Sequence, residues 1–308
     1  MCLTGFLMSS AVQAQYYRGN REIDDVKYQP EISISMGGTN FLGDLGGRPG
    51  EGKPFVKDFL FQTIRPYVGV SAGWNPENWY SLTAVAGYTV VDGADSLITM
   101  RGGQERWRVY RNNSFRSRIF ELSAMGELRL LPLLDPTHQM HQFSPYVGLG
   151  IGLFHFNPQA PLNGQWIYLH PLHLEGQGFP EYPDRKEYKL TQIYIPISLG
   201  VKYYMRSRMA VSLSALFRKT FTDYIDDVST TYIDPKLFNK YLSPGDAILA
   251  RQLYSRSLRP EKVKPNVGKG EPGNKDNYVS VVCSVSFILN RQPVAHYPGR
   301  PRDERWWK

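Results

Sequence analysis

The sequence predicts an all-β fold, an eight-stranded antiparallel up-and-down transmembrane β-barrel with long extracellular loops, on three observations. Apolar residues recur at every second position, over segments longer than the roughly 5–6 residues of a globular strand. The positions between them carry small, polar or charged residues. The connections between these segments alternate between long and short.

The alternation is clearest in two neighbouring segments joined by a turn at Arg206-Ser207-Arg208. The first carries Ile193, Ile195, Ile197, Leu199 and Val201, and the second carries Met209, Val211, Leu213, Ala215 and Phe217. A period of two places each set on one face of a strand, and the tight turn predicts an antiparallel hairpin. Such a hairpin fits half of a soluble sandwich, or the wall of a membrane barrel whose apolar face meets lipid.

Six further segments show the same alternation and complete the set of eight. They run from Glu31 to Gly38, Thr63 to Trp74, Trp79 to Val91, Phe115 to Leu131, Phe143 to His155 and Asn277 to Asn290. The polar connection 92–114 carries several arginines, residues 157–186 read as another long loop, and the longest connection, 222–276, is expected to hold a short helix within 240–259.

The lengths of the connections favour the barrel over the sandwich. In chain order they run long, short, long, medium, long, short, long. In an up-and-down barrel alternate connections lie at the same end, so all long loops share one rim. This asymmetry is typical of bacterial outer-membrane barrels, and an even strand count places both termini in the periplasm. A sandwich predicts no such sorting.

Composition agrees with this interpretation. The chain has 308 residues, of which 42% are hydrophobic, and a mean hydropathy of −0.38. These values exclude a bundle of transmembrane helices. The net charge of +8 indicates either a generally basic surface or attraction to anionic lipid or an acidic partner. No nucleic-acid-binding motif is present, and Cys2 and Cys283 do not form a disulfide framework.

The predicted organisation has four parts. Residues 1–14 resemble a secretory signal peptide, although no Lys or Arg precedes the apolar run. Residues 15–30 form an N-terminal periplasmic segment, residues 31–290 the outer-membrane barrel, and residues 291–308 a basic, aromatic periplasmic tail.

The inward face carries charged and very small residues. An eight-stranded barrel is filled by its own side chains, so we expect the charges to neutralise one another rather than to line a pore. They are Glu121, Glu127, Arg129, Lys202 and Arg218. For Arg218 a wet position at the rim is an equal alternative. The stripe Gly148, Gly150 and Gly152 is expected to leave room for Tyr194 and Tyr204.

No catalytic, cofactor or metal site is predicted. His170, His173 and Glu175 lie in a Pro/Gly-rich loop without ligand spacing, and His155 has no matched nucleophile. The run Asp223, Asp226, Asp227 and Asp234 could bind calcium, but it lacks the spacing of a calcium loop. A structural role at the end of a strand is therefore favoured.

Six short motifs, taken in order, resemble those of the PorG family. They lie at 37–46, 113–124, 144–146, 156–158, 174–178 and 221–232, and the last is the most distinctive. The residues that carry the resemblance are Gly37, Gly38, Asn40, Gly43, Asp44, Phe115, Ser117, Glu121, Ser144, Pro145, Asn157, Pro158, Glu175, Gly176, Gln177, Gly178, Thr222, Asp223, Tyr224, Asp226, Asp227, Val228 and Ser229.

The resemblance implies a non-enzymatic outer-membrane component of the type IX secretion system. Such barrels associate with a periplasmic ring built from a PorK-like lipoprotein and a PorN-like protein. Two other functions remain open: a barrel that mediates adhesion or surface binding through its loops and, third, an outer-membrane lipid-modifying enzyme.

The tail departs from the family, in which many chains stop soon after the last strand. It carries Arg300, Arg302, Arg305, Trp306 and Trp307. Aromatic anchors with steering charges suit a partner contact, here with the ring. The alternative is a disordered basic tail.

Overall fold

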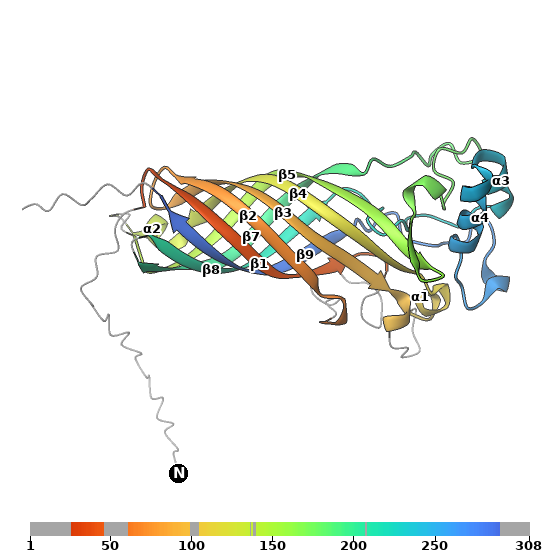
Figure 1. Cartoon of the computed structure of the whole chain (residues 1–308), viewed down its shortest axis with the longest axis horizontal. Helices are drawn as coiled ribbons and strands as arrows, with labels where there is room; N and C mark the ends of the chain where they lie inside the picture. Colours follow the sequence, from red (N-terminus) through yellow and green to blue (C-terminus); the bar gives the residue numbers. More distant parts are fainter. Residues whose placement is uncertain are drawn as a thin grey trace, which may run out of the picture.

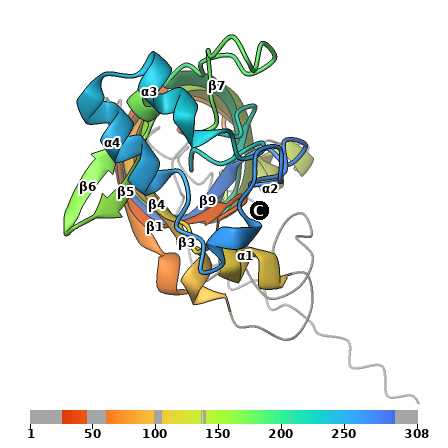
Figure 2. The same cartoon turned by 90° about the vertical axis from the view of Figure 1, so that its right-hand side faces the viewer.

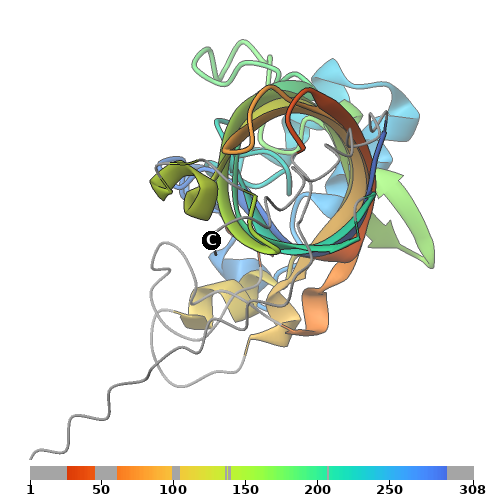
Figure 3. The same ribbon diagram turned by 90° about the vertical axis from the view of Figure 1, so that its left-hand side faces the viewer.

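Among the described residues, eight of the nine strands form one closed barrel (Figure 1). The computed structural model describes residues 26–45, 61–98, 105–135, 137, 140–206 and 208–289. The barrel strands are β1 (Gln29–Leu42), β2 (Arg65–Asn75), β3 (Tyr80–Ala94), β4 (Ser114–Arg129), β5 (Phe143–Leu162), β7 (Thr191–Arg206), β8 (Met209–Thr220) and β9 (Asn277–Ile288). Each is antiparallel to its neighbours, and β1 pairs with β9 to close the ring, which Figure 3 shows end-on. The predicted fold class is confirmed.

The two ends of the barrel differ as the connection lengths predict. The links β2–β3, β4–β5 and β7–β8 lie at one end, together with the start of β1 and the end of β9. Helix α2 (Leu130–Leu134) lies in the link between β4 and β5. The other end, the loop end, carries α1 (Glu105–Arg111), α3 (Phe238–Tyr241) and α4 (Pro244–Leu253) (Figure 1). Helix α4 falls inside the expected helical range.

Several boundaries differ from the prediction. Strand β1 continues to Leu42, beyond the predicted end at Gly38. Strand β5 continues to Leu162 and folds back as a hairpin with β6 (Gln165–Tyr168), within residues expected to be a loop. Asn163 and Gly164 at its turn both have positive φ, as an Asn-Gly hairpin turn requires. The 92–114 connection also contains α1, which periodicity did not predict.

The outward face of the barrel is apolar. Leu149, Leu199 and Leu213 have exposed fractions of 61%, 63% and 60%. The same exposure is shared by side chains from all the other barrel strands, among them Ile34, Val70, Leu82, Leu122 and Val281. So much exposed apolar surface is not found on soluble monomers and is the lipid-facing band of an outer-membrane barrel. Among the described residues, no helix is long and apolar enough to cross a membrane.

Buried ion pairs lie in the lumen, but of the charges expected to pair with one another only Arg218 and Glu121 do so among the described residues, and Glu127 accepts from the Ser81 hydroxyl at 3.4 Å. Arg218 donates to both carboxylate oxygens of Glu121, at 2.6 and 3.2 Å, and its side chain is fully buried. The alternative position for Arg218 at a wet rim is therefore wrong. Lys202 pairs at 2.6 Å with Glu31, which was not among the expected charges. Arg129 instead donates to the Asn78 carbonyl at 3.0 Å.

The rest of the inward face packs closely. A cavity of about 80 Å³ remains among serines and threonines near the short turns, room for a few waters rather than a channel. Gly152 makes room for Tyr194, since a Cβ there would lie 2.4 Å from the Tyr194 ring. Tyr204 does not use the glycine stripe. It packs near the short turns with Val26, Met140, Ala210 and Ile288.

Candidate functional site

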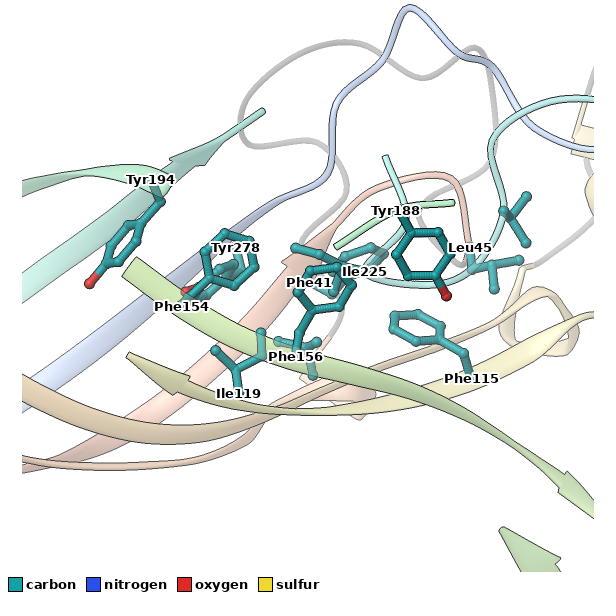
Figure 4. Packing of buried hydrophobic residues seen from close by; sticks show 12 residues of the cluster. Phe41, Leu45, Phe115, Ile119, Phe154, Phe156, Tyr188, Tyr194, Ile225 and Tyr278 are labelled. Carbon is teal, nitrogen blue, oxygen red and sulfur yellow. The ribbon is translucent and has the colours of Figure 1, made fainter. Parts of the chain in front are cut away.

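The loop end of the lumen is closed by an aromatic cluster. Figure 4 shows rings from β1, β4, β5, β7 and β9 directed into the barrel, where they meet Tyr188 and Ile225 from the loops. Phe41 and Phe115 meet edge-to-face at 4.8 Å. Tyr188 lies parallel to Phe156 at 6.1 Å and to Tyr224 at 4.5 Å. We call this cluster, with the 222–229 segment that covers it, the loop-end plug.

Buried carboxylates fix the backbone of the 222–229 segment. Asp226 accepts hydrogen bonds from the amides of Leu45 (3.2 Å) and Val228 (2.9 Å). Asp276, just before β9, accepts from the amide of Ile225 at 2.9 Å. Asp227 has φ of +60° and accepts from the Tyr188 hydroxyl at 2.8 Å. These contacts join the 222–229 segment to the first loop at Leu45, to the loop before β7 at Tyr188, and to the far end of its own loop at Asp276.

Glu175 holds the other side of the plug. Its carboxylate accepts from the amides of Ser229 (3.1 Å) and Thr230 (2.8 Å) and lies 3.4 Å from Lys269 Nζ. Gly176 and Gly178 have φ of +73° and +81°, a conformation that favours glycine. The 174–178 motif therefore forms a tight loop in which the Glu175 carboxylate binds the end of the 222–229 segment.

The plug keeps several carboxyl groups away from water. Burial raises the pKa of Asp223 and of Asp227 to about 7. Burial and the neighbouring carboxylates raise the pKa of Asp226 and of Asp276 well above the usual range. Among the described residues, one oxygen of Asp227 and one oxygen of Asp276 have no hydrogen-bond partner. A carboxyl group in such a place favours its protonated form.

Within the described chain, no group of three or more His, Cys, Asp or Glu side chains is arranged to hold a metal ion. The rings of His170 and His173 lie 6.3 Å apart, and His170 contacts the Tyr188 carbonyl at 2.9 Å. Asp234 lies outside the plug and caps a short 3-10 helix by accepting from the Lys236 amide. The acidic run thus has structural contacts at the end of β8.

Most motif residues lie at the loop end, but the structure does not bring all of them together. Ser144 and Pro145 are at the start of β5, near the short turns, and Glu121 is in the middle of the lumen. Gly37 and Gly38 allow close strand contact, because a Cβ on Gly37 would lie 2.1 Å from the Val281 carbonyl. The tail residues Arg300, Arg302, Arg305, Trp306 and Trp307 lie outside the described residues.

The remaining motif residues are placed as follows. Asn40 donates to Thr63 at 3.0 Å, and Asp44 accepts from the Glu271 amide at 2.6 Å. Gly43 lies against Asp276, and the Pro158 carbonyl accepts from the Leu169 amide at 2.9 Å. The others that line or support the plug are Phe115, Ser117, Asn157, Gln177, Thr222, Tyr224, Val228 and Ser229.

Sequence reasoning missed the residues that hold the plug from outside the motifs. Arg111 makes a bidentate pair with Asp95, both contacts at 2.8 Å, and donates to the carbonyls of Asp44 and Lys269. Burial alone would lower the pKa of Arg111, but Asp95 raises it above the usual value. No pattern in the sequence distinguishes Arg111 from the other arginines of its loop.

Comparison with known proteins gives only distant similarity. No protein-family model matches the chain, and no curated protein matches it. Among solved structures, the chain is similar to the N-terminal β-barrel domain of Pseudomonas aeruginosa OprF, at 9% identity and a TM-score of 0.34, covering 86% of this chain and 100% of that one. It is also similar to Neisserial surface protein A, at 10% identity and a TM-score of 0.37, covering 84% and 96%.

A third similar structure is the outer-membrane enzyme PagL, at 13% identity and a TM-score of 0.30, covering 83% of this chain and 97% of that one. Similarity at this level carries no argument about activity or partners. The class defined by the closed ring, the apolar exterior and the filled lumen is an eight-stranded outer-membrane β-barrel.

Proposed function

We propose that this chain is a non-enzymatic outer-membrane barrel that anchors or assembles the type IX secretion machinery, linking a periplasmic ring of PorK-like and PorN-like proteins to the outer membrane. The observation that supports it best is the convergence of motifs from separate loops on one buried plug. Gly43, Glu175 and Asp226 come from three different connections, and all contribute to it. A filled lumen suits an anchor better than a channel.

On this proposal the short turns and both termini face the periplasm, and the ring binds there. The short-turn end offers an apolar contact on α2, where Leu134 is 77% exposed and Leu131 37% exposed. Burial of these leucines in a protein interface would remove apolar surface from water. The basic tail would add charge to the same side.

The test is co-purification from detergent-solubilised outer membrane, with an affinity tag placed at Gly273 in a long loop. We expect PorK-like and PorN-like proteins to co-elute, and Leu134→Asp to reduce their recovery. Leu258→Asp is the matched control, since Leu258 is 62% exposed at the loop end. Removal of residues 293–308 tests the tail. Elution of the folded barrel without ring proteins contradicts the proposal.

An adhesion or surface-binding role is the second candidate. It is favoured by the amount of ordered structure in the loops, where residues of α3 and α4 build a hydrophobic core of their own. Deletion of the gene separates the two functions. Loss of secreted cargo with an intact outer membrane supports the first, and normal secretion with lost surface binding supports the second.

A lipid-modifying enzyme is the third candidate. His155 Nδ1 lies 3.0 Å from the Thr191 hydroxyl on the exposed face of the barrel, a contact that sequence reasoning did not anticipate. Within the described residues this pair contacts no carboxylate that would orient the imidazole. Lipid analysis of membranes with Thr191→Val checks this candidate, and we expect no change.

A further inference from the structure

A second cavity lies at the loop end, outside the barrel opening. It has a volume of about 670 Å³, within the usual range for small-ligand sites. One wall is α1 and the other is the 257–269 part of the last long loop. Figure 2 shows α1 beside the barrel opening, on the opposite side from α3. No residue of the aromatic cluster or of the 222–229 segment lines the cavity, so it is separate from the loop-end plug, although Arg111 and Lys269 contact both.

The two walls are held together by hydrogen bonds. The Tyr110 carbonyl accepts from the Leu258 amide at 2.8 Å and from the Ser257 hydroxyl at 3.0 Å. Arg259 donates to the Tyr110 hydroxyl at 3.3 Å, and its guanidinium lies 4.2 Å from the Tyr110 ring centroid. The cavity is thus a built feature that joins two connections distant in sequence.

The lining of this cavity is cationic. Six of its residues are Arg or Lys, and among the described residues that line it none is Asp or Glu. The charges of two of the six are neutralised by carboxylates that do not line the cavity: Arg111 by Asp95 at 2.8 Å, and Lys269 by Glu175 at 3.4 Å. Arg106, Arg259 and Lys262 are exposed, and among the described residues no carboxylate pairs with them. An anion would supply the missing charge.

Aromatic side chains share the cavity with these cations. Trp107 on α1 is 64% exposed, and Tyr110 and Tyr232 also line it. An exposed indole is costly in water, and a flat ring can cover it. A sugar ring has an apolar face that packs on such aromatics, and guanidinium groups bind phosphate, sulfate and carboxylate bidentately.

We propose that this cavity binds an anionic saccharide, held by Trp107 against the sugar ring and by Arg106, Arg259 and Lys262 on its phosphate, sulfate or carboxylate. The site does not depend on the proposed function. Because the cavity lies beside the rim of the barrel, the anionic saccharide has two possible sources. It belongs either to the phosphorylated sugar of a neighbouring glycolipid or to a soluble anionic glycan.

The test measures binding to the full chain in nanodiscs. The soluble probe is phosphorylated mannopentaose, with neutral mannopentaose as its control. The glycolipid probe is monophosphoryl lipid A incorporated into the disc. Its binding is measured by how far it reduces the binding of phosphorylated mannopentaose. We expect phosphorylated mannopentaose to bind at least tenfold more tightly than the neutral sugar, less tightly at high salt, and Trp107→Ala to weaken it at least tenfold.

The decisive variant is the triple change Arg106→Gln, Arg259→Gln and Lys262→Gln, which we expect to abolish the preference for the phosphorylated sugar. The matched control removes the same charge elsewhere at the loop end, by changing three exposed residues outside the cavity: Lys186→Gln, Lys236→Gln and Arg251→Gln. It should bind as the unchanged chain does. Retained heat-modifiable migration in gels verifies that each variant is folded.

Three outcomes overturn the proposal: no binding of the phosphorylated sugar, equal loss in the two triple variants, or equal binding of inorganic pyrophosphate. The last result would make the site a general anion site rather than a saccharide site. Competition by the glycolipid assigns the source to the membrane, and binding without competition assigns it to a soluble glycan. Both of these results support the proposal.

Discussion

The lumen near the short turns and the loop-end plug close the same barrel in different ways. Near the short turns, polar side chains pair across strands: Ser33 with Ser286 at 2.8 Å, and Lys202 with Glu31 at 2.6 Å. At the loop end, aromatic side chains meet carboxylates that come from loops, as where the Tyr188 hydroxyl donates to Asp227. The first region combines pairs between neighbouring strands, which register sets, with pairs across the lumen, which the closure of the barrel sets. The second requires separate loops to meet.

This difference separates two requirements of the fold. Register fixes which side chains lie opposite each other on neighbouring strands, so Ser33 and Ser286 meet as β1 and β9 pair. Among the described residues, the strand-lined lumen leaves the Ser198 hydroxyl without a partner, whereas the plug leaves a carboxyl oxygen without one, at Asp276. Unpaired buried polar groups lower stability, and they are often found where function requires them.

Removing Arg218 should have the largest effect, because the Arg218–Glu121 pair joins the two regions. Arg218→Met leaves the Glu121 carboxylate buried without its cation, although the Tyr278 hydroxyl still donates to it at 2.9 Å. We expect the free energy of unfolding to fall by about 3–5 kcal/mol, measured by urea unfolding in lipid vesicles. The control is Arg218→Met with Glu121→Leu, which should recover most of the loss. Equal destabilisation of the single and double variants would contradict this assignment.

Gly37→Ala tests how closely β1 and β9 pack, and it should lower the free energy of unfolding by less than Arg218→Met does. The new Cβ would lie 2.1 Å from the Val281 carbonyl, which belongs to the backbone and cannot rotate away. We expect a loss of about 1–3 kcal/mol in the same unfolding measurement. Gly126→Ala is the matched control, because its nearest atom, the Leu149 carbonyl oxygen, is 4.0 Å away. Equal stability of the two variants would show that β1 and β9 can separate without cost.

The strand-built half of the molecule could be predicted from sequence. A period of two places Lys202 and Arg218 inward whatever the loops do, because a one-residue slip would reverse every side chain. It did not identify Glu31 as the partner of Lys202, because pairing depends on the curvature that brings β1 and β7 together across the lumen. Local turn chemistry could have revealed one more element, since Asn163-Gly164 is a hairpin signal.

The loop-built half could not be predicted from periodicity. Tyr188, Asp276 and Arg111 lie far apart in sequence and have no spacing that relates them, yet all support the plug. Only the motif resemblance marked part of this region, through Glu175 and the 222–229 segment. Their shared role follows from contacts between loops, and long-range contacts leave no periodic trace in a single sequence.

A change in pH should have the smallest effect on global stability, because the carboxyl groups that titrate near neutral pH lie in the plug. Asp223 and Asp227 have a pKa of about 7 when folded and a usual value of 3.8. The folded plug therefore binds protons that the open plug releases. Its stabilisation is complete below about pH 4 and is lost as the pH rises to about 7. Hydrogen exchange of the 222–229 amides, corrected for the intrinsic rate, should thus be slower at pH 5 than at pH 8.

Asp227→Asn removes one of these titrations while keeping the oxygen that accepts from Tyr188 and tolerating the φ of +60°. We expect it to reduce the difference in exchange between pH 5 and pH 8. Asp184→Asn, at an exposed position of the same end, should leave the difference unchanged. If serine amides of β9, such as Ser284, showed the same pH dependence, the plug and the strand-paired lumen would open as one unit. The loop-end plug and the lumen near the short turns would then not be separate units of local opening.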